Sequence, residues 1–111
     1  MEARELRIGN YINYVTYGGA EPSKVTFDLL SRWQQDNRLY SPIPLTEEFF
    51  LKHISSDNCI ILEEMQIMFE DGGYYLADND GLGVGVDYIK YVHKLQNLIY
   101  ELTNEELTIN L

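Results

Sequence analysis

The sequence predicts an α+β fold, with a mostly antiparallel sheet of five to six strands, one short middle helix and a long C-terminal helix packed on the sheet. Two patterns lead to this prediction. Apolar and polar residues alternate in several short stretches, which are separated by turns containing glycine or proline. In residues 87–104, by contrast, apolar residues recur every three or four positions, the period of a helix that buries one side.

The first strands are expected near the N-terminus. Residues 5–16 and 24–33 alternate apolar and polar side chains, and residues 17–23 between them carry two glycines and a proline. We therefore predict an antiparallel pair of strands joined by a turn. Residues 38–41 are expected to form a brief third strand.

A short helix is expected in the middle of the chain. The Pro-Ile-Pro sequence at 42–44 lacks two backbone donors, so the sheet should pause there. Thr46 follows as a predicted N-cap of a helix over residues 47–54, whose first turn is acidic and so suits the helix dipole. The side chains expected to be buried are Phe50, Leu51 and Ile54.

Three more strands are expected at residues 59–70, 73–78 and 82–86. An Asp-Gly-Gly turn at 71–73 would join the first two, because glycine supplies the positive φ of a tight hairpin. An Asn-Asp-Gly turn at 79–81 would precede the last one.

Two glycines, Gly83 and Gly85, lie on one face of the last predicted strand. Glycine inside a strand is unfavourable unless something lies close to the backbone. We expect either a bulge or a bulky aromatic neighbour over that face, and the alternative is a peptide or ligand lying on it.

The long helix is predicted over Asp87–Asn104. Asp87 is the expected N-cap, and Asn104 suits the left-handed residue that follows a helix. Thr103 and Glu106 fit a capping box for one further helical turn, with residues 107–111 as a tail or edge strand. The apolar stripe comprises Ile89, Val92, Leu95, Leu98, Ile99 and Leu102.

The composition is that of a single folded domain over residues 1–111, with 45% hydrophobic and 13% aromatic residues. No apolar run approaches the about 20 residues of a membrane span. The first residues are of mixed charge, without the apolar segment of a signal peptide. With Cys59 as the single cysteine, no internal disulfide can form. We therefore expect a cytoplasmic protein.

The chain is acidic, with 18 acidic and 8 basic residues and a net charge of −10. Phosphates would be repelled by this charge, so direct binding to nucleic acid is not expected. Residues 53–89 contain no lysine or arginine but eight carboxylates. This acidic segment either serves solubility, or forms a surface that meets a basic partner or imitates DNA.

Motifs for metal binding or catalysis are weak. Residues 78–81, Asp-Asn-Asp-Gly, approach a calcium loop, but its first ligand position would fall on Leu76, so a simple turn is expected. His53 and His93 lie in different predicted helices, and neither is next to Cys59 in sequence. We expect no catalytic residue, no cofactor and no metal ion, and hence no enzyme.

A polar strip on the long helix is the candidate partner-binding site. At about 100° per residue, its four members fall together beside the apolar stripe. The alternative is that they bond to the sheet edge or to loops at the helix margin. The strip comprises His93, Gln96, Asn97 and Tyr100.

Three segments resemble a known group of proteins. They are ELRIGNYI at 5–12, SPIPLTEEFFLK at 41–52 and YVHKLQNLIYELTNEEL at 91–107. In this order they resemble small uncharacterised proteins of gut Bacteroidota, often found in phages and integrated mobile elements. The resemblance implies a mobile-element accessory protein in the cytoplasm of a bacterial host.

Together these observations predict a non-enzymatic accessory protein that binds a protein partner, with a homo-oligomer of the chain as one form of that association. The alternative is an acidic inhibitor or DNA mimic that acts on a host nucleic-acid enzyme.

Overall fold

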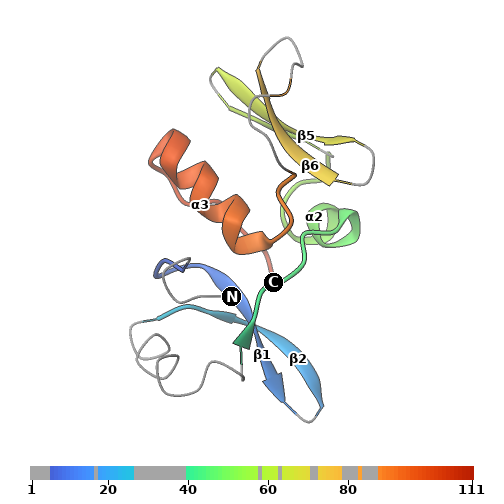
Figure 1. Cartoon of the computed structure of the whole chain (residues 1–111), viewed down its shortest axis with the longest axis vertical. Coiled ribbons are helices and arrows are strands. Elements are labelled where there is room, and N and C mark those ends of the chain that lie inside the picture. Colours follow the sequence, from blue (N-terminus) through green and yellow to red (C-terminus); the bar gives the residue numbers. More distant parts are fainter. Residues whose placement is uncertain are drawn as a thin grey trace. The chain divides into compact units, whose positions relative to one another are not determined.

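The computed structural model describes residues 6–16, 18–26, 40–57, 59–62, 64–70, 73–78, 83 and 88–111. These residues form strands and two α-helices (Figure 1), which confirms the α+β class. The chain divides into two compact units. Unit 1 comprises Met1–Pro44 and Tyr91–Leu98, and unit 2 comprises Leu45–Lys90 and Ile99–Leu111. The single domain expected for residues 1–111 stays a prediction.

The strands form two sheets of three, not the single sheet of five to six strands that we predicted. In unit 1 the order is β2-β1-β3, with β1 at Tyr11–Thr16, β2 at Gly19–Lys24 and β3 at Tyr40–Ser41. Both neighbours of β1 run antiparallel to it. The brief third strand is confirmed at its last two residues.

The second strand begins earlier than predicted. Pairing of Thr16 with Gly19 leaves only two residues to connect β1 and β2, so the stretch predicted as a turn is largely strand. Gly19 has a φ of 125°, which a side chain would disfavour. Pro22 is accommodated because β2 lies at the edge of the sheet formed by the described strands. Most of the strand predicted at 24–33 lies outside the described residues.

The first strand begins later than predicted, because a turn precedes it. The backbone N–H of Asn10 donates to the Arg7 carbonyl at 3.0 Å, and the Arg7 N–H donates to Asn10 Oδ1 at 2.7 Å. Val25 then bonds to Asn10 through its N–H (2.7 Å), and its carbonyl accepts from Gly9 N–H (2.9 Å). These bonds hold residues 7–10 as a closed turn beside the start of β1.

The core of unit 1 combines apolar and polar side chains. Its buried apolar side chains come from β1, the end of the β2 segment, the proline-rich link and the first turns of α3. They are Ile12, Val25, Ile43, Val92 and Leu95, and the polar Asn10, His93 and Gln96 are buried as well. The Val92 N–H donates to the Ile43 carbonyl at 2.9 Å, which ties the start of α3 to the link.

Unit 2 begins with α2 at Glu47–His53, which confirms the predicted middle helix. Thr46 is the N-cap, and its Oγ1 accepts a hydrogen bond from Phe49 N–H at 3.1 Å. Phe50 is fully buried. The expectation that Leu51 is buried was wrong, since it is 39% exposed.

The second sheet has the order β4-β5-β6, with β4 at Cys59–Ile61, β5 at Met65–Glu70 and β6 at Gly73–Asp78. A single strand over residues 59–70 was therefore wrong. The Leu62 N–H donates to the Met65 carbonyl at 2.8 Å and reverses the chain there. Strands β5 and β6 lie side by side (Figure 1), with Glu70 paired to Gly73 as in the predicted hairpin.

Of the strand predicted at 82–86, only Gly83 lies within the described residues. It pairs with Ala77 of β6 in an isolated antiparallel bridge. A Cβ at position 83 would lie 3.8 Å from Cδ2 of Tyr75, an ordinary contact. The ring of Tyr75 therefore lies over Gly83, which agrees with the expectation of a bulky aromatic neighbour at this glycine.

Helix α3 spans Val92–Thr103, 12 residues, so it begins later than the predicted Asp87. Residues 88–91 are extended, because their backbone groups bond elsewhere. Ile89 N–H donates to the Tyr74 carbonyl at 2.7 Å, and Tyr91 pairs with Pro44 in an isolated bridge. Asp87 itself lies outside the described residues.

The end of α3 is as predicted, but no second helical turn follows. Asn104 has a φ of 60°, and its N–H bonds to the Tyr100 carbonyl at 2.8 Å. The predicted capping box was wrong, because Thr103 Oγ1 accepts from Glu105 N–H at 3.1 Å. The C-terminal tail is joined to α2 by Asn110 N–H, which donates to the His53 carbonyl at 2.8 Å.

An aromatic stack forms the core of unit 2. The rings of Phe50 and Tyr74 are 4.3 Å apart and nearly parallel, and Phe69 packs 4.9 Å from Tyr74 at a tilt. Ile67, Ala77 and Ile99 are also buried.

Gly73 is a position where any side chain should destabilise the fold. A Cβ there would lie 2.6 Å from Cδ1 of the Tyr88 ring, which is too close for two carbon atoms. We expect Gly73→Ala to lower the free energy of unfolding by about 1–2 kcal/mol in urea denaturation. Gly83→Ala is the matched control and should cost less. Equal costs, or no relief when Tyr88→Ala is added to Gly73→Ala, would contradict this explanation.

Stability should fall at alkaline pH because of Tyr74. Burial, together with the negative charge of Glu47, raises the pKa of Tyr74 from 10.0 to about 12. The folded state therefore holds the proton more tightly, and the resulting stability is present below pH 10 and lost as the pH rises towards 12. In urea denaturation, Tyr74→Phe should lose less stability between pH 9 and 11 than the parent chain. Parallel losses in the two proteins would refute the assignment, and the exposed Tyr100→Phe serves as control.

Candidate functional site

The four residues of the predicted polar strip lie on α3, but mostly not on the surface. His93 and Gln96 are each 1% exposed, Asn97 is half-buried and Tyr100 is 37% exposed. The His93 ring stacks beside Tyr91, with 6.0 Å between ring centroids. Tyr100 is thus the member of the strip with substantial surface to offer a partner.

Gln96 uses its carboxamide to satisfy the backbone at the entrance to β1. Its Oε1 accepts a hydrogen bond from Tyr11 N–H at 2.7 Å, and its Nε2 donates to the Gly9 carbonyl at 3.1 Å. Buried backbone groups without partners are costly. The side chain of Gln96 therefore makes the two backbone hydrogen bonds that a neighbouring strand would otherwise make at this point.

Asn97 extends the same network to two side chains of the N-terminal turn. Its Oδ1 accepts from Asn10 Nδ2 at 2.8 Å and from Arg7 Nε at 3.1 Å. Arg7 also donates through Nη2 to the Gln96 carbonyl at 3.3 Å. The hydrogen bonds made by the side-chain carboxamides of Gln96 and Asn97 are those expected if the strip bonds to loops at the helix margin. Partner binding by the strip stays a prediction.

Arg7 and Asn10 were not identified from the sequence as part of this network. Arg7 and Asn10 lie at the N-terminal end of the chain and Asn97 lies on α3, and no local sequence pattern pairs residues so far apart.

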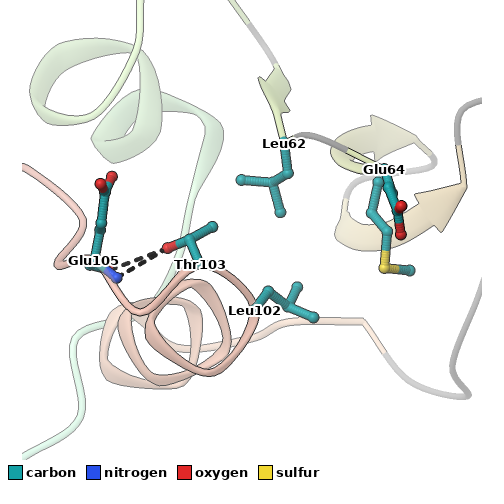
Figure 2. A pocket seen from close by; sticks show the side chains of 6 residues that line it. Leu62, Glu64, Leu102, Thr103 and Glu105 are labelled. Atoms are coloured by element: carbon teal, nitrogen blue, oxygen red, sulfur yellow. Dashed lines mark hydrogen bonds between the residues drawn. The ribbon is translucent and has the colours of Figure 1, made fainter.

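A different surface, in unit 2, is hollowed. One cavity of about 390 Å³ lies between the end of β4 and the end of α3. The side chains of Leu62 and Leu102 approach it from opposite sides, and Glu64 lies at its margin (Figure 2). The hydrogen bond from Glu105 N–H to Thr103 Oγ1 fixes the chain that leaves α3.

A second cavity of about 490 Å³ adjoins the first and shares Leu62, Thr103 and Glu105 with it. The two cavities together are called the β4 groove. The charged residues that line the second cavity are Asp57, Glu105 and Glu106. Neither lysine nor arginine occurs among the described residues that line the groove. The groove was not predicted, because it depends on the chain reversal between β4 and β5.

Apolar side chains are unusually exposed around this groove. Ile61 at the end of β4 is 77% exposed, and Leu102 on α3 is 42% exposed. Cys59, a half-buried free cysteine, also lines the second cavity. The β4 groove therefore combines apolar area with negative charge.

Among the described residues, no three His, Cys, Asp or Glu side chains are grouped so that they could hold a metal ion. Within the same residues, no helix is long and apolar enough to cross a membrane. Comparison of the chain with protein-family models, curated proteins and solved structures gave no significant match.

The amide network should matter for stability. Gln96→Ala leaves Gly9 O and Tyr11 N–H without their partner, and we expect the free energy of unfolding to fall by about 1–3 kcal/mol in urea denaturation. Glu101→Ala, an exposed position on the same helix, should change it by less than about 0.5 kcal/mol. The structural role of Gln96 would be refuted if the two variants were equally stable.

Proposed function

We propose that this chain is a non-enzymatic protein-binding protein that acts through the β4 groove. The proposal is carried by one observation, the two adjoining cavities of about 390 and 490 Å³ beside an exposed isoleucine. Apolar area that is left in water at such a surface favours association, because a partner that covers it removes that area from water.

The chemistry of the groove supports binding in place of catalysis. Its charged side chains are all carboxylates, which are dispersed among apolar and hydroxyl side chains, and this mixture suits recognition of a complementary surface. On α3, the carboxamides of Gln96 and Asn97 are already held in hydrogen bonds within unit 1. Side chains fixed in this way support the fold and are poorly placed to take part in a reaction.

The resemblance of three segments to mobile-element proteins supports an accessory role in the cytoplasm of a bacterial host. The partner would then be another protein of the element or of the host.

The acidic inhibitor or DNA mimic is the alternative function. A mimic needs carboxylates spaced along one continuous face like phosphates. In the groove the carboxylates alternate with apolar residues such as Leu62 and Leu102. This mixture favours association with a protein surface over imitation of DNA.

Charge reversal in the groove tests the proposal. The parent chain and the double variant Glu64→Lys/Glu105→Lys would each be used to capture proteins from a lysate of a gut Bacteroidota species. We expect specific captured proteins with the parent chain and their loss with the variant, because the carboxylates that attract the partner are replaced by like charges.

The matched control is Glu21→Lys/Glu101→Lys, which changes the net charge equally at exposed positions outside the groove. The control should capture the same proteins as the parent chain. Equal capture by all three proteins, each with an unchanged melting temperature, would contradict a role for the groove.

A further inference from the structure

The second cavity of the groove follows the edge of strand β4. Four consecutive residues, 59 to 62, line it. Successive side chains of a strand point to opposite faces, so side chains of a single face cannot explain this lining. The cavity therefore runs along the edge of the strand, where atoms of successive residues line it.

The hydrogen-bond register shows which backbone groups of β4 point towards that edge. The Leu62 N–H bonds to the Met65 carbonyl, so residue 62 is a hydrogen-bonded position of the hairpin. In an antiparallel pair these positions alternate, so Ile60 opposite Ile67 is the next one. The N–H and C=O groups of Cys59 and Ile61 consequently point away from β5.

This edge of β4 is open in the described part of the chain. The sheet order β4-β5-β6 places β5 on one side of β4 and no described strand on the other. No hydrogen bond from the described residues reaches the outward backbone groups of Cys59 and Ile61. An edge of this kind is a template for another strand.

The charge of the surroundings selects the strand that fits. Asp57, Glu105 and Glu106 line the same cavity as the β4 edge, together with the apolar Ile54 and Leu107. An incoming strand would place alternate side chains on opposite faces. A strand with lysine or arginine at every second position, and apolar residues at the positions between, would match this lining.

We propose that the β4 edge binds an extended segment of a partner protein by strand addition, and that basic and apolar residues alternate in that segment. This inference rests on the proposed function and names its partner chemistry. Main-chain hydrogen bonds to Cys59 and Ile61 supply affinity, and the acidic and apolar lining supplies specificity. Three strand residues span about 10 Å, enough to pair with three or four residues of the segment.

Charge argues against the other occupants of this edge. A second copy of the chain would bring a groove of the same negative sign against the first, and the whole chain carries a net charge of −10. Nucleic acid would be repelled for the same reason. A basic segment is attracted by the same carboxylates.

The experiment uses a fluorescein-labelled octapeptide of alternating lysine and valine as the probe, with binding measured by fluorescence anisotropy. Three comparison peptides have the same length. One alternates glutamate and valine, and the other two are the lysine–valine peptide with the backbone nitrogens of either its lysines or its valines methylated. We expect the probe to bind and the glutamate peptide not to bind. The methylated peptide whose methyl groups face β4 should bind at least about tenfold more weakly than the probe, and the other methylated peptide should bind more tightly than that one.

On the protein, Ile61→Pro removes the outward N–H while leaving the bonds to β5 in place, since proline is tolerated at an edge. Ile61→Ala keeps that N–H and removes only the side chain. Binding of the probe should fall about tenfold for Ile61→Pro and about threefold or less for Ile61→Ala. If Ile61→Pro unfolds the chain, the two methylated peptides still decide the question.

Strand addition is overturned if the probe does not bind, if the glutamate peptide binds as well, or if both methylated peptides bind as tightly as the probe. Equal binding by Ile61→Pro and Ile61→Ala would overturn it too. Such a failure is distinguishable from failure of the proposed function, because capture of a partner protein sensitive to Glu64→Lys/Glu105→Lys would still show binding at the groove by another mode.

Discussion

The side chain of Gln96 takes the place of a strand at the entrance to β1, and unit 1 depends on it. Without that carboxamide, the Tyr11 N–H and the Gly9 carbonyl would lose these bonds at part-buried positions. The side chain of Asn97 likewise accepts hydrogen bonds, from the side chains of Arg7 and Asn10. The network joins the turn at residues 7–10 to α3 across more than 80 positions of sequence, and the apolar core of unit 1 is organised around the same helix.

A consequence for function follows from this use of polar side chains. Residues that already bond to the protein's own backbone would have to break those bonds in order to meet a partner, at a cost of about 1–3 kcal/mol for each buried group. The β4 groove in unit 2 carries no such cost for its outward backbone groups. Exposed apolar area, carboxylates and an open strand edge occur there together. For this reason we place the proposed binding surface at the groove instead of on the polar flank of α3.

Local signals in the sequence were sufficient for some elements and misleading for others. Thr46, Asn104 and the hairpin after Glu70 depend on capping or turn chemistry within a few residues, and the structure has them as predicted. The predicted first residues of β2 and α3 were wrong, because partners distant in sequence determine where these elements begin. Pairing with β1 makes Gly19–Lys24 a strand. Pairing with Tyr74 and Pro44 keeps residues 89–91 extended. The groove could not be predicted, because apolar and polar residues keep alternating through the chain reversal at Leu62. Residues 59–70 therefore resemble one continuous strand in the sequence.

Amide hydrogen exchange measured by NMR on the free protein tests the open edge of β4 most directly. We predict that the rate of exchange alternates from residue to residue along this short strand. The amide hydrogens of Ile60 and Leu62, which bond to β5, should exchange slowly, whereas those of Cys59 and Ile61 should exchange rapidly with solvent. Equal protection at all four positions would mean that the outward groups already have partners, and would contradict the proposed binding of a strand there.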